Sequence, residues 1–234
     1  MPEQQNHARH TQAAPHSTEH RFAYLLAGQL AMLLVYPLLA GDQPRPGLLA
    51  PFTIAVILAS LYAILRDRRA AIWGAVLGTP AIVFGLLVSV SSEAPVKKAA
   101  LAFMTLFFAF ACATILKGVL TSPRVTSDTL YGAISSYLLA GVTWGTAYVL
   151  IEQTSPGSFR SSIDPGRALY WPDFTFFSFA TLTTVGYGDM VPVKGFARSL
   201  ALLEAVAGVM FPAVIIGRLI AFLVGGRSRQ EHEG

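Results

Sequence analysis

The residues from Thr184 to Gly188 have the types and spacing needed to hold a dehydrated cation with backbone oxygens. A cation that leaves water needs oxygen ligands in place of its hydration shell, and backbone carbonyls supply them without a fixed negative charge. Successive carbonyls can point to one axis only if the backbone alternates between unusual conformations, and Gly186 and Gly188 accept a positive φ at no steric cost. The Thr184 hydroxyl adds an oxygen at the inner end. Val185 and Tyr187 are expected to pack behind the carbonyls.

A short helix is expected directly before these residues. Pro172 suits the first turn of a helix, and Asp173 suits its positive amino terminus. About twelve residues then lead to the carbonyl segment, which is too few to cross a bilayer. We therefore expect a re-entrant helix, because non-helical backbone at membrane depth is tolerated only inside protein or along a wet cavity. The partial negative charge at its carboxyl end would favour a cation.

The composition of the chain predicts a membrane protein. Of its 234 residues, 53% are hydrophobic and 13% are charged, whereas soluble domains carry about 25% charged residues. The net charge of +4 is better explained by basic residues beside lipid than by a nucleic-acid surface. Cys112 is the only cysteine, so an intrachain disulfide is excluded. The chain contains no Walker loop, HExxH or GxSxG sequence, and we expect it not to be an enzyme.

Six apolar segments are long enough to cross a bilayer as helices, which takes about 20 residues each. They are residues 22–40, 48–65, 70–90, 99–120, 129–151 and 199–224. We therefore predict an all-α membrane protein with six transmembrane helices and one re-entrant helix. An even number of spans puts both termini on one side of the membrane. The positive-inside rule places them in the cytoplasm, although Lys97 and Lys98 run against this trend.

The segment Thr184–Gly188, followed by Asp189 and Pro192 and flanked by two spans, resembles the selectivity filter of potassium channels. The resemblance covers the two-helix pore module of that family, at residues 129–224. It implies that the re-entrant helix is a pore helix and that a filter loop follows it. The ion-binding residues implied in this way are Thr184, Val185, Gly186, Tyr187 and Gly188.

The resemblance also implies how such a protein works. It would conduct K+ passively across the plasma membrane, with K+ ions in the filter and no organic cofactor. One filter segment per chain implies a homotetramer, because each layer of carbonyls needs four strands. The expected partners are other copies of the chain and the lipid bilayer, with no nucleic acid and no small-molecule substrate.

The surroundings of the filter depart from the family pattern. Many potassium channels carry tryptophans late in the pore helix, where an indole N–H braces the filter. Phe176 and Phe177 stand in that stretch here, and phenylalanine has no donor. Some prokaryotic channels instead have a glutamate near the end of the pore helix, where Ala180 stands. Asp189 is a candidate for filter support, and the sequence leaves its partner open.

Glu204 is the only acidic residue deep in a predicted span. A carboxylate in a membrane is costly and normally faces protein or water. We expect Glu204 to support the filter from behind by bonding to pore-helix hydroxyls such as Ser178 or Thr181. The alternative is a structural glutamate without a functional role.

Two residues of the last span are candidates for a gating hinge. Gly208 lies 22 positions after Gly186, where potassium channels often have a hinge glycine, and close helix packing is an equal alternative. Pro212 removes one intrahelical hydrogen bond and can kink the helix. Gly141 and Gly145 are spaced for close packing of the 129–151 helix against a neighbour.

The first four predicted spans lack the charges of a voltage sensor. A sensor needs several arginines in its fourth helix, and residues 99–120 contain none. We therefore predict that opening is not steeply voltage-dependent. About ten residues follow the last span, so we expect no cytoplasmic regulatory domain after it. Arg218 is expected to snorkel to lipid phosphates.

The predicted organisation has five parts. They are a disordered polar tail (1–20), a four-helix peripheral transmembrane domain (21–120), a linker (121–128), a pore domain (129–226) and a short polar tail (227–234). The alternatives to a potassium channel are an ion-translocating subunit of a K+ transporter and a less selective cation channel. Four filter loops in one chain would favour the transporter subunit. An acidic residue in place of Tyr187 would favour the less selective cation channel.

Overall fold

The computed structural model describes residues 21–35, 38, 46–65, 67–91, 93–123 and 125–232. Its elements are α1 (Arg21–Leu30), the π-helical segment η1 (Ala31–Val35), α3 (Pro46–Ile64), α4 (Arg68–Val90), α5 (Ala94–Thr121), α6 (Ser127–Thr154), β1 (Phe159–Ser161), α7 (Trp171–Leu182), β2 (Met190–Pro192) and α8 (Gly195–His232). The predicted tail at 1–20 and most of the end of the first predicted span lie outside the described residues.

Four of the described helices are long and apolar enough to cross a membrane, namely α4, α5, α6 and α8. The other two predicted spans correspond to shorter apolar helices, Arg21–Val35 and Leu49–Ile64. At 1.5 Å per residue, Leu49–Ile64 reaches roughly 24 Å, less than the roughly 30 Å of a hydrocarbon core. The mostly helical membrane fold is therefore supported, and a full set of six spans stays a prediction.

Local sequence signals start the helices. Asp67 caps α4 by accepting hydrogen bonds from the backbone N–H groups of Arg69 and Ala70. Pro172 lies in the first turn of α7, and the Asp173 carboxylate accepts a hydrogen bond from the Tyr170 backbone N–H at 2.8 Å. The short helix predicted before the filter is therefore confirmed, with twelve residues.

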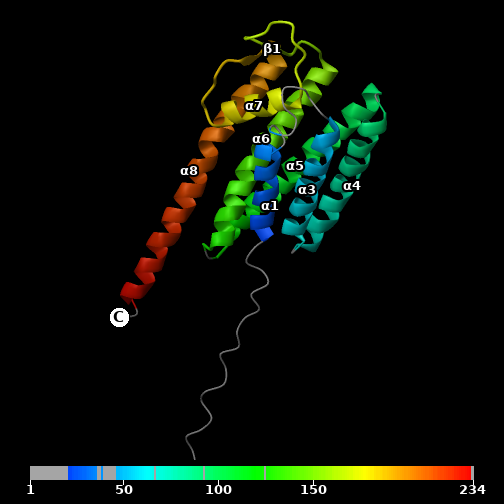
Figure 1. Cartoon of the computed structure of the whole chain (residues 1–234). Coiled ribbons are helices and arrows are strands. Elements are labelled where there is room, and N and C mark those ends of the chain that lie inside the picture. Colours follow the sequence, from blue (N-terminus) through cyan, green and yellow to red (C-terminus); the bar gives the residue numbers. More distant parts are fainter. Residues whose placement is uncertain are drawn as a thin grey trace, which may run out of the picture.

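Figure 1 shows α1, α3, α4 and α5 as a bundle beside α6, with α8 running along the other side of the molecule. Helix α1 begins and α8 ends far from α7 and β1 (Figure 1). Buried apolar side chains from α1, α3, α5 and α6 form one continuous core, which includes Leu25, Ile57, Phe107 and Leu139. The predicted peripheral helices are therefore packed onto the outer helix of the predicted pore domain.

A small antiparallel sheet departs from the expected all-helical fold. Strand β1 pairs with β2, so that Phe159 lies opposite Pro192 and Ser161 opposite Met190. A second buried cluster lies beneath this sheet and includes Tyr148, Phe159, Phe174 and Phe177. The sequence gives no signal for these strands, because three-residue segments carry too little alternation to stand out from a loop.

Candidate functional site

The carbonyl segment has an alternating backbone. The φ angles are 61° at Thr184, 56° at Gly186 and 80° at Gly188, while Val185 and Tyr187 between them have negative φ. This alternation is the one expected for successive carbonyls that share a direction. Thr184 is the sole non-glycine residue with positive φ among the described residues. Left-handed backbone costs a residue with a Cβ roughly 1–2 kcal/mol, so the residue types predict it at the two glycines and not at Thr184.

The amide groups at the start of this segment are tied back to the end of α7. The backbone N–H of Thr184 donates to the Thr181 carbonyl at 3.0 Å. Those of Val185 and Gly186 both donate to the Ala180 carbonyl, at 2.9 and 3.1 Å. Among the described residues, the carbonyls from Thr184 to Gly188 accept no hydrogen bond, and this segment is exposed. Its oxygens are therefore available to an ion.

The side chains of this segment contact little within one chain. Val185 is 54% exposed and Tyr187 is 66% exposed, so the packing expected behind the carbonyls is not formed inside a single chain. The Tyr187 ring does stack on Phe176, with 5.4 Å between ring centroids and 17° between ring planes. Phe176 therefore contacts Tyr187 through its face, in the stretch where a hydrogen-bond donor is missing.

The outer end of the segment is held by backbone hydrogen bonds from the loop that contains β1. The Ser162 N–H donates to the Asp189 carbonyl at 2.7 Å, and the Val193 N–H donates to the Ser158 carbonyl at 2.8 Å. These bonds extend the β1–β2 pairing on both sides. The Asp189 carboxylate makes no hydrogen bond to the described part of the chain, so the main chain of Asp189 is what the loop holds.

Glu204 joins three helices. It is fully buried in α8. The Ser178 hydroxyl in α7 lies 2.5 Å from Glu204 Oε1, and the Tyr148 hydroxyl in α6 donates to Oε2 at 2.5 Å. The Ser178 hydroxyl also lies 2.7 Å from the Gly141 carbonyl. The structure therefore brings Ser178 and Glu204 together, and it adds Tyr148, which the sequence analysis missed.

A sequence signal for Tyr148 did exist. Tyr148 stands in the predicted span 129–151. A tyrosine hydroxyl that is buried there usually has a hydrogen-bond partner. A tyrosine in one predicted span and a glutamate in another could have been paired on that ground. No principle of sequence spacing, however, links residues 56 positions apart.

Gly208 lies directly against the end of α7. A Cβ at this position would lie 1.9 Å from the Leu182 carbonyl oxygen and 2.7 Å from the Leu182 carbonyl carbon. The Tyr137 hydroxyl of α6 donates to the same Leu182 oxygen at 3.1 Å. Helices α6 and α8 therefore meet at Leu182, the last residue of α7, two residues before the carbonyl segment. This contact agrees with the close-packing alternative for Gly208. Helix α8 continues as one helix through Pro212.

Helix α6 also approaches α7 through glycines, as predicted. A Cβ on Gly141 would lie 2.6 Å from the Phe179 ring, and one on Gly145 would lie 3.2 Å from the Thr175 Cα. The small residues therefore set the distance between α6 and α7.

Arg218 has a hydrogen-bond partner within the chain, because its guanidinium donates to the Ser122 carbonyl at 2.8 Å. Its expected position at the lipid phosphates stays a prediction. Ser122 caps the carboxyl end of α5, where the last carbonyls of a helix lack intrahelical donors. The contact ties α8 to the segment between α5 and α6.

Comparisons with known proteins agree with the position of this site. A family model described as "Ion channel" matches residues 136–225. Protein LctB of Bacillus caldotenax is 30% identical over 100 residues, which are 42% of this chain and 74% of that protein.

Two relatives are potassium channels by name. The inward rectifier potassium channel Kirbac3.1 of Paramagnetospirillum magnetotacticum is 33% identical over 89 residues, 36% of this chain and 26% of that protein. Two pore potassium channel c of Oryza sativa subsp. japonica is 29% identical over 97 residues, 42% of this chain and 19% of that protein. No solved structure matches the chain.

Proposed function

Because this chain belongs to the ion channel family, we propose that it is a potassium-selective channel that conducts K+ passively across the membrane as a homotetramer. The observation that carries the proposal is the alternating backbone at Thr184, Gly186 and Gly188, with carbonyls that make no hydrogen bond in the described chain. Oxygens of this kind can replace the hydration shell of K+. The proposed ion ligands are Thr184, Val185, Gly186, Tyr187 and Gly188.

The surfaces left open in one chain support the fourfold assembly. Val185 and Tyr187 are exposed beside the filter, and α8 carries a row of exposed apolar side chains. Contiguous apolar surface of this kind marks an interaction site, and α8 follows the filter directly. In the proposed tetramer, neighbouring copies cover the filter side chains, and the α8 helices surround the inner pore. The exposed row comprises Leu202, Leu203, Val206, Val209, Met210 and Val214.

The membrane arrangement is part of the proposal. The protein is a multi-pass membrane protein. We assign it six spans, with α1–η1 and α3 as the shorter two, a re-entrant α7 and both termini on the cytoplasmic side of the plasma membrane. Helix α5 contains Lys97, Lys98 and Lys117 near its ends and no arginine. Because gating charges in the fourth span are missing, opening is proposed not to depend steeply on voltage.

The contacts around α7 suggest how the filter is supported. Glu204, Ser178 and Tyr148 join α8, α7 and α6 behind it. Asp189 contributes its main chain to the outer end. Gly208 and Pro212 remain the proposed hinge candidates, with Gly208 also acting as the contact point on Leu182.

The decisive experiment measures ion flux from proteoliposomes that contain the purified protein, with K+ gradients compared with Na+ gradients. The wild type is expected to pass K+ and to exclude Na+. Tyr187→Asp places a carboxylate at the filter and should remove the preference. Equal K+ and Na+ flux in the wild type would contradict the selectivity and favour the less selective channel. Flux that requires a second protein would favour the transporter subunit.

A further inference from the structure

An apolar cavity of about 230 Å³ lies among α3, α4, α5 and α6, away from the filter. An engineered apolar cavity of roughly 150 Å³ in another protein stays dry and binds benzene, and the cavity in this chain is larger. Small residues leave this space open, because Ala50, Ala81, Gly85 and Ala100 line it from three helices. The cavity is therefore large enough for part of an acyl chain.

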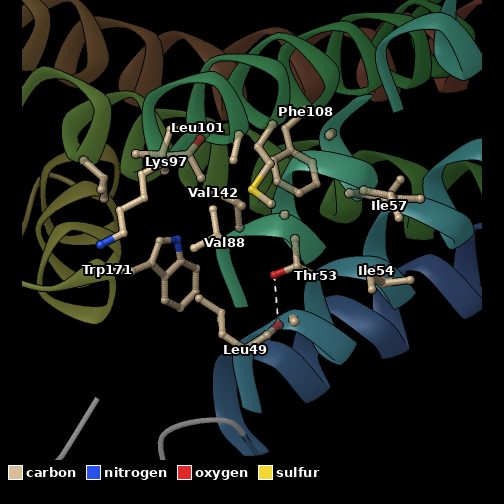
Figure 2. Close-up of a pocket in the computed structure, with 18 of the residues that line it drawn as sticks. Leu49, Thr53, Ile54, Ile57, Val88, Lys97, Leu101, Phe108, Val142 and Trp171 are labelled. Atoms are coloured by element: carbon tan, nitrogen blue, oxygen red, sulfur yellow. Dashed lines mark hydrogen bonds between the residues drawn. The ribbon is translucent and has the colours of Figure 1, made fainter. Parts of the chain in front are cut away.

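The polar groups in the body of the cavity are already satisfied. The Thr53 hydroxyl donates to the Leu49 carbonyl at 3.0 Å, and the Thr146 hydroxyl donates to the Thr143 carbonyl at 2.9 Å. Neither hydroxyl has a proton left for a ligand. The rest of the wall is aliphatic and aromatic, and Ile57 and Phe108 lie at the end away from Trp171 (Figure 2). The wall therefore suits a hydrocarbon.

One end of the cavity carries a positive charge. Lys97 in the first turns of α5 and Trp171 at the start of α7 line this end. Both residues are labelled at this end of the cavity in Figure 2. In the part of the chain that the structure describes, the one ion pair joins Arg167 to Asp173, and no carboxylate pairs with Lys97. An unpaired cation at the mouth of an apolar cavity favours an anionic headgroup.

We propose that this cavity binds the acyl chain of an anionic amphiphile, with the headgroup at Lys97. Each buried methylene contributes to binding, and the ammonium group adds electrostatic attraction to the head. The same chemistry is offered by a free fatty acid and by an anionic phospholipid of the bilayer. The occupant would contact Trp171, the first residue of the helix that leads to the filter.

Tryptophan quenching by brominated acyl chains tests this binding without any ion flux, so its outcome is separate from the proposed channel activity. The full-length protein is placed in nanodiscs of neutral phosphatidylcholine. Trp73→Phe and Trp144→Phe leave Trp171 as the only indole. A brominated fatty acid is then titrated, and saturable quenching of Trp171 is expected.

Two substitutions with matched controls locate the site. Gly85→Leu extends into the cavity, and the atom that its Cβ would meet is the flexible Met104 methyl. Because each displaced methylene weakens binding about fourfold, the half-saturating concentration should rise about tenfold or more. Gly118→Leu makes the same change on α5, where a Cβ meets nothing within 4 Å, and it should leave the titration unchanged.

The charge is tested in the same way. Lys97→Gln should weaken binding of the acid roughly twofold to fivefold, the scale of a partly exposed ion pair. Lys98→Gln should have no effect. The methyl ester of the same acid should bind the wild type and Lys97→Gln equally. If Gly85→Leu does not fold, the comparison of the two lysine variants still decides the question.

A second measurement, with a brominated phospholipid, distinguishes the two sources of the acyl chain. Brominated phosphatidylglycerol is used as the nanodisc lipid in place of the free acid. If Gly85→Leu reduces quenching by the fatty acid and by phosphatidylglycerol, the cavity also binds the phospholipid acyl chain. If Gly85→Leu reduces quenching by the fatty acid alone, the ligand is a free fatty acid. Either outcome supports the site. Equal quenching of Gly85→Leu and Gly118→Leu in both arms would overturn it.

Discussion

The contacts around α7 and the packing among α3, α4 and α5 differ in how closely they hold the chain. At α7, three glycines allow helix contacts that a Cβ would obstruct, and a buried Glu204 receives hydrogen bonds from two other helices. Among the peripheral helices, apolar side chains surround an open cavity of about 230 Å³. Backbone contacts and directed hydrogen bonds tolerate little displacement, whereas apolar side chains can repack. Helix α7 is therefore held in one position, and the peripheral bundle can adapt.

Gly208→Ala is expected to have the largest effect of the changes that test this difference. Its Cβ would lie 1.9 Å from the Leu182 carbonyl oxygen, and backbone cannot move aside as a flexible side chain can. We expect a loss of stability of about 3 kcal/mol, at the upper end for overpacking, together with loss of K+ flux. Thermal unfolding of the purified protein and proteoliposome flux measure the two.

Gly217→Ala is the matched control in the same helix, because a Cβ there meets nothing within 4 Å. It should leave flux and the unfolding temperature close to those of the wild type. If Gly208→Ala behaved like Gly217→Ala, the close contact with Leu182 would not be what holds α8 to α7.

Tyr148→Phe is expected to have an intermediate effect. It removes the hydroxyl that donates to Glu204 Oε2, and an unpaired buried polar group costs about 1–3 kcal/mol, or more when it is charged. The unfolding temperature should fall. If the network supports the filter, the K+ preference or the persistence of the current should change as well.

Tyr131→Phe is the control for this change, since Tyr131 lies in the same helix, is partly exposed and makes no hydrogen bond among the described residues. A fall in stability without any change in ion flux would show that Glu204 is structural only. That result would remove the functional role expected for Glu204.

Gly85→Ala should have the smallest effect, and it tests the adaptable side of the comparison. Its Cβ would lie 2.7 Å from the Met104 terminal methyl, which can rotate into the neighbouring cavity. The gain in helix propensity from glycine to alanine is about 1 kcal/mol and offsets the contact. The unfolding temperature should stay within a few degrees of the wild type; a loss as large as that of Gly208→Ala would mean that the peripheral bundle is packed as rigidly as α7.

Much of the site could be predicted from the sequence, because its signals are local. The short helix before residues 184–188 follows from Pro172 and Asp173, and positive φ at Gly186 and Gly188 follows from the absence of a Cβ. The close packing of Gly141 and Gly145 follows from their spacing on one helix face. These inferences depend on neighbours within a few residues along the chain.

The remaining features depend on residues distant in sequence. The Tyr148–Glu204 hydrogen bond spans 56 positions, and the Arg218–Ser122 hydrogen bond spans 96. No local pattern predicts either of these hydrogen bonds. The β1–β2 pairing was missed for the same reason.

The sequence alone therefore determined the positive φ of Gly186 and Gly188, the start of α7 and the membrane character of the chain. These depend on backbone stereochemistry and composition, which each residue carries with it. The packing of helices decided the contact of Gly208 with Leu182, the partners of Glu204 and the cavity beside Lys97. Those features exist only where separate helices meet, because steric fit and buried hydrogen bonding are properties of the assembled interior.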